Sequence, residues 1–468
     1  MTIARRENEP ETSVDVLIIG AGACGLVAAL ASSEAGAEVM VLERDNVPAG
    51  STALSSGFIP AYGTRWQAEA GVEDSVSIMS EDIQAKNHDE ADPVLVEAVA
   101  SAAGPTLEWL ADQHGQQFVL LDGFLYPGHR KHRMHAHPNK TGAALIASLA
   151  TAVEAAEVPI VTNAHVTRLL ANDEDRVVGV ELSRPDGSVE EIGCKALILA
   201  CNGYGGNSEM VKQHIPEMAD ALYFGHVGNQ GDAVSWGEAL GGEALNMGSY
   251  QGHGSVAHPH GALITWALMM EGGIQVDILG KRFSNEHEGY SEQSVKVLAQ
   301  PEQIAWNLYD ERLHQMGMGF EDYRGAEAAG AIKRFDNLTG LAEAIGCDEA
   351  DLTQTLEQTS AFANSSVADP FGRDFSNAPA LAGPPYYAVR VTGALFHTQG
   401  GLSIDAKGRV LRRGSGQALP NLLAGGGAAV GVSGKSVSGY LSGNGLLTAV
   451  ALGKLTGEEA ARLVREGA

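Results

Sequence analysis

A glycine-rich segment near the N-terminus constrains the fold of this chain more than any other feature. An apolar run leads into Gly20, Gly22 and Gly25, spaced Gly-x-Gly-x-x-Gly, and a second apolar run ends at Glu43, 18 residues after Gly25. The first glycine permits a tight turn, the second lets a pyrophosphate approach the backbone, and the third lets helix and strand pack closely. The following helix offers free N–H groups to phosphates, and the acid accepts hydrogen bonds from ribose hydroxyls. This order predicts a dinucleotide site in a Rossmann-like α/β domain.

The pattern along the 468 residues predicts that this domain is split in the sequence. Strand and helix runs alternate up to residue 246, and they resume after residue 384. Between them, helical runs and histidine-rich loops dominate and clear strands are few. We therefore expect a first part of the nucleotide-binding domain at 1–246, an inserted α+β capping domain at 247–384, and a second part of the nucleotide-binding domain at 385–468.

Composition argues against several classes of partner. The chain has 58 acidic and 31 basic residues, a net charge of −27, which disfavours nucleic acids and anionic membranes. Its cysteines, Cys24, Cys194, Cys201 and Cys347, form no CxxC pair, so we expect reduced, buried thiols and a cytoplasmic protein. The polar start of the chain predicts no signal peptide, and no window of 18 apolar residues suggests a membrane span.

Several segments in combination resemble the flavoprotein superfamily of fumarate reductases and ketosteroid dehydrogenases. They cover nearly the whole chain: Gly20 to Gly25, Ser51 to Gly57, Arg133-Met-His, Asn229-Gln-Gly-Asp232, Gly280-Lys-Arg-Phe-Ser-Asn285-Glu286, Phe396-His-Thr-Gln-Gly-Gly401, and the C-terminal glycine-rich helix. The resemblance implies FAD as the cofactor, with the isoalloxazine between the nucleotide-binding and capping domains. Because the loop 51–57 carries no histidine, we expect non-covalent FAD.

The same resemblance implies which residues surround FAD. They belong to the glycine turn, the loop 51–57, the ends of later strands and the C-terminal segment: Gly20, Gly22, Gly25, Glu43, Arg44, Ser51, Thr52, Ser56, Gly57, Val166, Asn202, Gly203, Asp232, His397, Gly427, Asn444 and Leu446. Gly427 departs from relatives that have a glutamate there. Arg282, Asn285 and Glu286 are expected to hold the capping domain together by hydrogen bonds.

Two tyrosines stand where fumarate reductases have arginines. One of those arginines lies four residues beyond the Asn-Glu pair, which is Tyr290 here, and another lies in the last glycine-rich segment, which is Tyr440 here. A phenol has one O–H group and cannot replace the bidentate fork of a guanidinium. Ketosteroid Δ1-dehydrogenases have tyrosines at both places. The resemblance therefore favours desaturation of a ketone over fumarate reduction.

That branch implies a division of labour. Tyr440 and a backbone N–H at Gly443 or Gly445 would bind and polarise a substrate ketone, which stabilises enolate charge and acidifies the α-hydrogen. Tyr290, as tyrosinate or through a hydrogen-bonded relay, would take the α-proton. We also consider Tyr126 as an aid to proton departure. His253 lies near the position of a substrate-contacting histidine of the fumarate reductases, and a structural or surface role is its alternative.

The histidine-rich cluster at 129–137 suggests a metal site. However, the neighbouring arginine and lysine cations would repel a metal ion, and no carboxylate or cysteine accompanies the histidines, so no metal is expected. We expect instead a cationic lining usable against a substrate carboxylate. The predicted enzyme is a dehydrogenase for a cyclic ketone, either a 3-ketosteroid or a smaller cyclohexanone, including a keto acid, with an open electron acceptor. Its alternatives are a reductase of an activated C=C bond and a flavin-binding protein without turnover.

Overall fold

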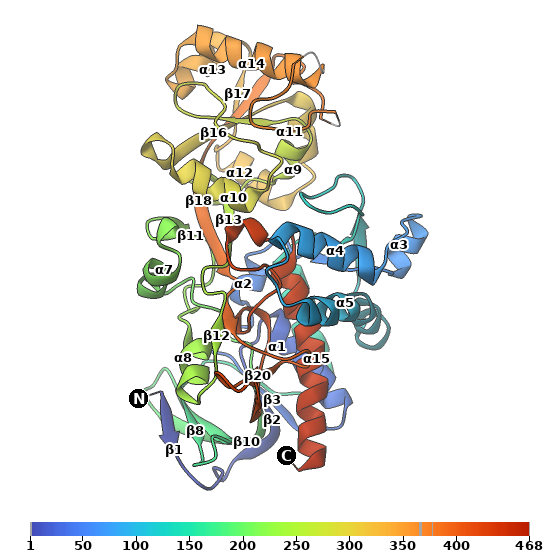
Figure 1. The fold of residues 1–468 in the computed structure, drawn as a ribbon, viewed down its shortest axis with the longest axis vertical. Coiled ribbons are helices and arrows are strands. Elements are labelled where there is room, and N and C mark those ends of the chain that lie inside the picture. Colours follow the sequence, from blue (N-terminus) through green and yellow to red (C-terminus); the bar gives the residue numbers. More distant parts are fainter. Residues whose placement is uncertain (1, 365–366, 377, 468) are drawn as a thin grey trace.

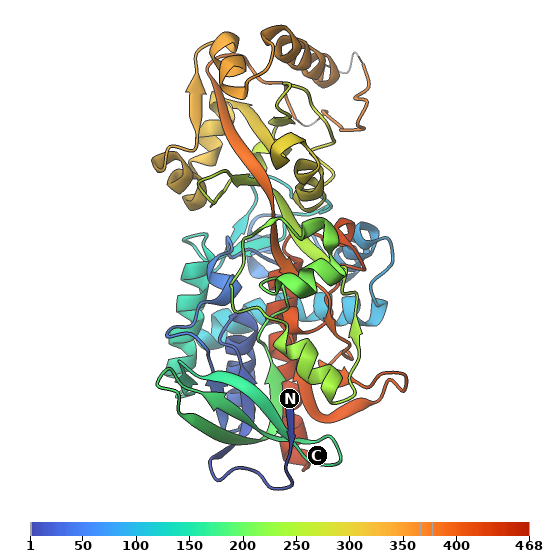
Figure 2. The same ribbon diagram turned by 90° about the vertical axis from the view of Figure 1, so that its left-hand side faces the viewer.

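The structure, a computed structural model, describes residues 2–364, 367–376 and 378–467. Two bodies lie one above the other along the longest axis, and both chain ends lie in the lower body (Figure 1). The lower body contains the glycine turn, and the upper body contains most of the expected insert. Figure 2 shows the long strand β18 (Tyr386–Thr398) running from the upper body into the lower one.

The lower body is built on a mixed nine-stranded sheet. Parallel pairing joins β10 to β2, β2 to β3, β3 to β7 and β10 to β21, while β8 and β9 add antiparallel strands. The strands are β1 (Ile3–Arg5), β2 (Ser13–Ile19), β3 (Val39–Leu42), β7 (Ile160–Val161), β8 (His165–Ala171), β9 (Val177–Ser183), β10 (Val189–Leu199), β20 (Arg409–Leu411) and β21 (Ala418–Ala424). Because β21 joins β10 from the far end of the chain, the predicted α/β fold with a split Rossmann-like domain is confirmed.

Helices cover this sheet and carry the C-terminal segment back to the glycine turn. Helix α1 (Ala23–Glu34) packs against both α15 (Asn444–Glu466) and α6 (Gly142–Ala155). The lower body also contains α2 (Gly50–Ala53), α3 (Arg65–Glu69), α4 (Val76–Asn87), α5 (Pro93–His114), α7 (Ser208–His214) and α8 (Asp232–Ala239), with the small sheet β4 (Ile59–Pro60), β6 (Met134–Ala136) and β5 (Val119–Leu121) and the pair β12 (Ala244–Leu245) and β19 (Gly401–Leu402).

One described helix, α5, is long and apolar enough to cross a membrane by length and composition, although half of its apolar window is buried in the fold. Leu95, Val99 and Leu107 of this helix lie in the core of the lower body. The sequence expectation of no membrane span rested on the lack of an unbroken window of 18 apolar residues, and Glu97 and Glu108 interrupt this helix. Its packing against α4 and α15 is that of a core helix.

The upper body contains a second sheet, and here the expectation of few strands was wrong. Its path is β14-β13-β18-β16-β15, and β11 and β17 also pair with β18. Glycine, serine and histidine fill β13, so it lacks an apolar alternation and forms because β18 pairs along it. The elements are β11 (Leu222–Tyr223), β13 (Tyr250–Ala257), β14 (Ala262–Leu263), β15 (Ile274–Val276), β16 (Ile304–Asp310) and β17 (Lys333–Phe335), with α9 (Ala267–Met270), α10 (Tyr290–Leu298), α11 (Glu311–Gly317), α12 (Glu321–Ala328), α13 (Leu338–Ile345) and α14 (Glu349–Ala363).

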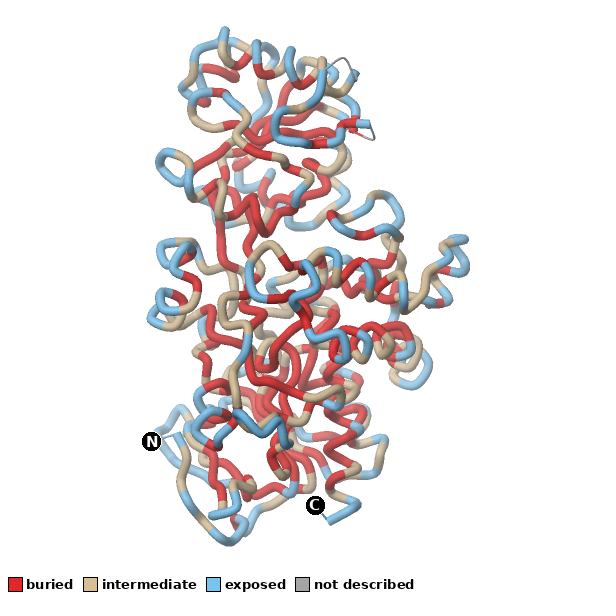
Figure 3. The backbone as a smooth tube through the Cα atoms, in the orientation of Figure 1, coloured by how far each residue is buried: buried red, intermediate tan, exposed pale blue. Residues whose placement is uncertain are grey.

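The expected boundaries at 246/247 and 384/385 stay predictions. The second sheet takes β11 from before the first boundary and β18 from after the second. Buried chain runs through the middle of both bodies and along β18 between them (Figure 3). The two bodies are therefore joined by continuous sheet as well as by loops.

A buried ionic network holds the capping region, as expected for Arg282 and Glu286. Arg282 donates to Glu286 at 2.6 Å and to Asp369 at 2.9 Å, and Arg373 contacts Glu286 at 3.1 Å. Burial raises the pKa of Glu286, but the hydrogen bonds and charges of the two arginines bring it down to about 2. Asn285 accepts a backbone hydrogen bond from His287 at 2.9 Å. These groups stabilise the loop that leads into α10.

Candidate active site

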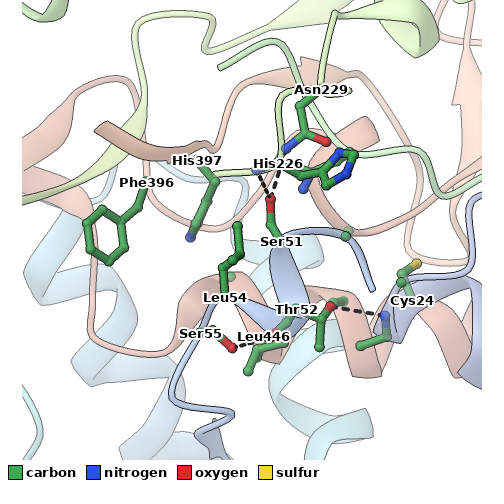
Figure 4. A pocket seen from close by; sticks show the side chains of 18 of the residues that line it. Cys24, Ser51, Thr52, Leu54, Ser55, His226, Asn229, Phe396, His397 and Leu446 are labelled. Atoms are coloured by element: carbon green, nitrogen blue, oxygen red, sulfur yellow. Dashed lines mark hydrogen bonds between the residues drawn. The ribbon is translucent and has the colours of Figure 1, made fainter. Parts of the chain in front are cut away.

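One cavity runs from the glycine turn to the capping region, and most of the predicted site residues line it. From the lower body it takes the glycine turn, the end of β3, the loop 51–57 and the start of α15, and from the upper sheet it takes aromatic residues of β13, β18 and α10. Figure 4 shows Cys24 towards one side of this cavity, Phe396 and His397 towards the other, and the loop that begins at Ser51 between them.

The glycine turn has the geometry that its spacing predicts. Gly20 has φ +105°, in the region that favours glycine, and a Cβ on Gly25 would lie 1.8 Å from the carbonyl oxygen of Gly20. At Gly22 the nearest atom to a Cβ is Thr52 Oγ1 at 3.7 Å, so this backbone is open towards the cavity. Gly25 does not line the cavity but lets α1 pack against the turn.

Glu43 lies at the end of β3 with its carboxylate fixed beside the cavity. It is 6% exposed, and it accepts hydrogen bonds from the backbone N–H groups of Ala21 at 2.9 Å and Asp45 at 3.0 Å. These bonds leave further lone pairs on the carboxylate for the hydroxyls of a ribose. The neighbouring Arg44 donates to the carbonyl oxygen of Gly228 at 2.6 Å. Burial raises the pKa of Asp232, and the charge of Arg44 opposes that effect.

The loop 51–57 is tied to the segments on both of its sides. Thr52 Oγ1 accepts from the N–H of Ala23 at 3.1 Å, and Ser51 Oγ accepts from Asn229 at 2.9 Å and from the N–H of His226 at 3.2 Å (Figure 4). The side chain of Ser56 donates to Asp322 of the capping region at 3.5 Å. This loop carries the backbone past the middle of the cavity.

Two helices begin at the cavity wall without competing anions. Neither α1 nor α15 has a side-chain cap or an acidic residue in its first turn. Their free N–H groups and positive dipole ends suit the pyrophosphate and an electron-rich ring edge. The donor set therefore fits FAD. The predicted cofactor residues that line the cavity are Gly20, Gly22, Glu43, Arg44, Ser51, Thr52, Ser56, Gly57, Val166, Asn202, Asp232, His397, Gly427 and Leu446.

Gly203 and Asn444, which were also predicted to contact the cofactor, do not line the cavity. A Cβ on Gly203 would lie 1.9 Å from Thr398 Oγ1, and Asn444 donates to Ser433 at 2.9 Å. Both residues support the cavity wall from behind. At Gly427 a Cβ would lie 2.2 Å from Asn202 Oδ1, so the asparagine occupies the space that a larger residue would need.

The predicted catalytic tyrosines meet where the two bodies join. Tyr290 is the first residue of α10, and its ring packs edge-on against Tyr440 with centroids 6.2 Å apart. Tyr440 accepts a hydrogen bond from the N–H of Gly445 at 3.3 Å. Gly443, with φ +87°, precedes α15 and lines the same cavity. The structure therefore brings together Tyr290, Tyr440 and Gly443, while their catalytic roles stay predictions.

The two tyrosines differ in acidity. Burial raises the pKa of Tyr290 to about 12, while the Ser442 hydroxyl, the Gly443 N–H and the Tyr440 hydroxyl act to lower it. Burial and the neighbouring charge of an ionised Tyr290 raise the pKa of Tyr440 well above its usual value. Tyr290 is thus the easier of the two to ionise, and Tyr440 keeps its proton. Environments that separate two titratable groups in this way suit one as base and the other as hydrogen-bond donor.

Tyr126 lies in the same cavity, 6.3 Å from Phe58 between ring centroids. Burial and the charge of Tyr290 raise its pKa, which places it within electrostatic range of the proposed base. The structure therefore brings Tyr126 to the site, as the sequence predicted. Its part in proton departure stays a prediction.

A stack of rings that sequence reasoning missed forms the wall behind Tyr290. Phe224 stacks on Phe396 at 4.8 Å, Phe396 on His253 at 5.2 Å, and His253 on Tyr290 at 4.8 Å. Trp266 packs edge-on against His253 at 5.8 Å. Phe224, Phe396, His253 and Trp266 come from four separate segments, so no local spacing could have grouped them. Two of them carried a signal on their own: Phe396 begins the block that contains His397, and the resemblance pointed to His253.

The two histidines at the capping end of the cavity, His253 and His397, are neutral. Burial lowers the pKa of His253 to about 3 and that of His397 to about 4. The N–H of Ser255 donates to Nδ1 of His253 at 3.1 Å, so a neutral His253 carries its proton on Nε2. His253 therefore lines the cavity instead of lying on the surface.

The cationic cluster at 129–137 does not serve the cavity, and that expectation was wrong. Arg133 is 1% exposed and pairs with Asp74 at 2.9 Å and with Asp82 at 2.7 Å, so its charge is already balanced. Arg130 binds Asp82 and Glu81 on the outer side. Met134 is the member of this cluster that lines the cavity. Among the described residues, no cluster of three or more histidine, cysteine, aspartate or glutamate side chains could hold a metal ion.

Of the four cysteines, all free, Cys24 and Cys194 are buried as expected, while Cys201 and Cys347 are partly exposed. Burial raises the pKa of Cys24 and of Cys201 to about 12, so both stay thiols at neutral pH. They line the nucleotide end of the cavity as apolar groups.

Comparison with known proteins agrees with this geometry. The chain is 29% identical to a probable fumarate reductase of Shewanella frigidimarina over 97% of this chain and 76% of the relative. It is 24% identical to the 4-oxocyclohexanecarboxylate 2-dehydrogenase of Sinomonas cyclohexanicum, over 86% of this chain and 85% of the relative.

Solved structures share the fold. The open conformation of a flavocytochrome c3 fumarate reductase superposes with a TM-score of 0.81 at 29% identity, covering 97% of this chain and 79% of that one. The 3-ketosteroid-Δ4-(5α)-dehydrogenase of Rhodococcus jostii superposes with a TM-score of 0.75 at 22% identity, covering 98% of this chain and all of that one. Residues 15–446 match the protein family described as FAD binding domain. The chain therefore belongs to the FAD binding domain family and is an FAD-dependent oxidoreductase that acts on CH–CH groups.

Proposed function

We propose that this enzyme desaturates a cyclic ketone next to its carbonyl group, with Tyr290 as base and Tyr440 as carbonyl-polarising donor. The observation that carries the proposal is the paired tyrosines at the junction of the two bodies, with the backbone N–H groups of α15 beside them. Bound FAD supplies the acceptor for the two electrons that leave the substrate as a hydride.

The chain's own residues provide the rest of the chemistry. Tyr440 keeps its proton and donates a hydrogen bond to the substrate carbonyl oxygen, and a backbone N–H at Gly443 or Gly445 donates to the same oxygen. The α-carbon then loses its proton to the oxygen of ionised Tyr290, and FAD held in the cavity would accept the hydride that leaves the β-carbon. A C=C bond forms between the two carbons. Tyr126 takes part in passing the proton away from Tyr290.

The electrostatics of the cavity support an uncharged ring as substrate. Among the described residues that line it, Arg44 is the only arginine or lysine, and it lies with Glu43 at the nucleotide end. Around Tyr290 the lining is aromatic, with the neutral His253 and Trp266. A carboxylate there would find no guanidinium to bind it, because Arg133 is paired elsewhere. Flat aromatic walls suit an apolar ring instead.

A relative gives independent support for a cyclic ketone as the substrate. The similar protein from Sinomonas cyclohexanicum is named as a dehydrogenase of an oxocyclohexane carboxylate, and it spans most of this chain. We therefore keep both a cyclohexanone and a 3-ketosteroid in the substrate class, with the electron acceptor left open. A cytoplasmic location remains part of the proposal.

The second candidate function is reduction of an activated C=C bond. It is favoured by the similarity to fumarate reductases over nearly the whole chain. Fumarate itself is disfavoured, because tyrosines replace the arginines of that resemblance.

A panel of substrates tests these two functions. We expect anaerobic mixing with saturated cyclic ketones or 3-ketosteroids to bleach the flavin absorbance and to produce an enone detectable by mass spectrometry. Bleaching by dithionite alone, followed by reoxidation with enones or enoates, would assign the chain to the reductases. Bleaching and reoxidation by neither class would contradict both functions.

We also propose that FAD is held non-covalently, because the loop 51–57 offers no histidine for a covalent link. Acid precipitation should release all of the flavin into the supernatant. Yellow colour that stays with the precipitated, washed chain would disprove this.

Glu43→Gln should weaken FAD binding by about 10-fold to 100-fold. The substitution keeps the size of the side chain but removes charge-assisted hydrogen bonds to ribose hydroxyls, each of about 1.5–3 kcal/mol. Titration of FAD into flavin-stripped protein, followed by flavin fluorescence, measures the change in Kd. The matched control is Glu38→Gln, on the exposed surface before the same strand, which should bind FAD like the parent. Equal Kd values for both variants would remove Glu43 from the cofactor site.

A further inference from the structure

A buried ion pair joins the two bodies immediately beside Tyr290. Lys86, in the last turn of α4 in the lower body, contacts the carboxylate of Glu292 in α10. Lys86 Nζ also donates to the carbonyl oxygen of Glu288 at 3.0 Å. The side chains are only 13% and 7% exposed. One lysine of the lower body thus contacts Glu288, two residues before α10 begins at Tyr290, and Glu292 in the first turn of α10.

The carboxylate of Glu292 depends on this lysine. Gly289, at the N-cap of α10, has φ +150°, and a Cβ there would lie 2.4 Å from Glu292 Oε2. The carboxyl group therefore folds back over the start of the helix, and its Oε2 has no hydrogen-bond partner among the described residues. Burial raises the pKa of Glu292, and the charge and hydrogen bond of Lys86 lower it. Without Lys86, a buried carboxylate would remain without a balancing charge.

The charge of the Lys86–Glu292 pair acts on Tyr290, the proposed base. Glu292 lies two residues after Tyr290 in the first turn of α10, and its negative charge acts to raise the pKa of Tyr290. The other titratable groups that face Tyr290 are Tyr440, Tyr126 and the neutral His253. The remaining titratable neighbours of Glu292 are Glu288, paired with Lys296 at the surface, and the uncharged Tyr250, which donates to Glu217. Lys86 is therefore the cation that offsets the buried acid nearest to Tyr290.

We propose that Lys86 is a positioning residue that acts on Tyr290 through Glu292. It fixes the first turn of α10 against the lower body, and it cancels the carboxylate charge that would otherwise oppose formation of the tyrosinate. This inference rests on the proposed role of Tyr290 as base. It adds a residue from the opposite body to the groups that control that base.

Opposite charge changes at the two ends of the pair should move the ionisation of Tyr290 in opposite directions. Lys86→Met leaves Glu292 unbalanced, so the apparent pKa of Tyr290 should rise by about one unit, the size of a charge interaction at this depth. Glu292→Gln combined with Lys86→Arg, whose guanidinium keeps its charge where a tyrosine ionises, leaves an unbalanced cation, so the pKa of Tyr290 should fall by a similar amount. Lys86→Met combined with Glu292→Gln should return close to the parent, and Lys86→Arg alone should keep the parent value.

The measurement is fluorine NMR on holoenzyme labelled with fluorotyrosine, in which the Tyr290 resonance is identified by its loss in Tyr290→Phe. Lys195→Met, which removes an exposed lysine paired with Asp15 at 2.8 Å in the lower body, is the matched control and should leave the titration unchanged. Shifts of the same sign in Lys86→Met and in Lys86→Arg/Glu292→Gln, or no shift in either, would overturn the proposal.

This titration needs no substrate, so it separates the inference from the proposed function. If no ketone bleaches the flavin but the opposite shifts appear, the proposed reaction fails and the control of Tyr290 by Lys86 stands. If ketones bleach the flavin but the pKa of Tyr290 is unchanged in the Lys86 and Glu292 variants, the proposed reaction stands and Lys86 has no positioning role. If the shifts appear without ketone turnover, the pH dependence of whatever reaction the enzyme catalyses through Tyr290 should move in the same direction as the pKa of Tyr290 in each variant.

Discussion

Replacing Tyr290 with phenylalanine should slow flavin reduction by a cyclic ketone about 1,000-fold while FAD stays bound. The substitution removes the group that takes the α-proton, and a general base contributes typically 100-fold to 10,000-fold. It removes no atom that the nucleotide end of the cavity uses. Stopped-flow absorbance under anaerobic conditions gives the rate, and the flavin spectrum of the purified variant gives the occupancy.

The pH dependence should change with it. Because the base must lose its proton before it acts, and because burial raises the pKa of Tyr290 to about 12, the parent rate should rise with pH through the alkaline range. In Tyr290→Phe this rise should be absent. Tyr386→Phe is the matched control, since Tyr386 is also a buried tyrosine of the upper sheet, 7% exposed, but it does not line the cavity. If Tyr290→Phe reacts within a few-fold of Tyr386→Phe, Tyr290 is a packing residue.

The nucleotide-binding fold could be predicted because its signals are local. Gly20, Gly25 and Glu43 lie within one strand-helix-strand unit. Glycine is required at Gly20 because φ is +105°, and at Gly25 because a Cβ would lie 1.8 Å from the carbonyl oxygen of Gly20. The upper sheet could not be predicted from local sequence signals. Strand β13 is polar and glycine-rich, and its partner β18 lies more than a hundred residues later, so its pairing is a tertiary effect.

The site shows the same division. Resemblance placed Tyr290 and Tyr440 correctly at one cavity, because both lie in blocks with fixed spacing. It could not reveal that Asp74 and Asp82 neutralise Arg133, since such a buried pair forms between distant segments. The cluster at 129–137 is cationic in sequence, but it adds no arginine or lysine to the cavity lining near Tyr290. The carboxylate of a keto acid therefore loses the partner that the sequence suggested.

Tyr440→Phe should lower the rate of ketone-dependent flavin reduction by about 100-fold to 1,000-fold, the usual cost of removing one donor from an oxyanion site. The phenylalanine keeps the ring that packs against Tyr290 and His397. It removes the hydroxyl whose pKa burial raises well above its usual value, so the parent has a protonated donor at every working pH. The N–H of Gly445, which donates to that hydroxyl at 3.3 Å, becomes free to bind the substrate and limits the loss.

The pH profile distinguishes this variant from Tyr290→Phe. Tyr440→Phe keeps its base, so its rate should still rise with pH, and the rise should move to higher pH because the Tyr440 hydroxyl no longer helps to lower the pKa of Tyr290. Stopped-flow traces of both variants across the alkaline range, with the same ketone, give the comparison. A flat profile for Tyr440→Phe would make Tyr440 the base instead, and a rise that moves to lower pH would contradict its role as a donor that lowers the pKa of Tyr290. A loss of bound FAD in either variant would place that tyrosine on the cofactor and not on the carbonyl.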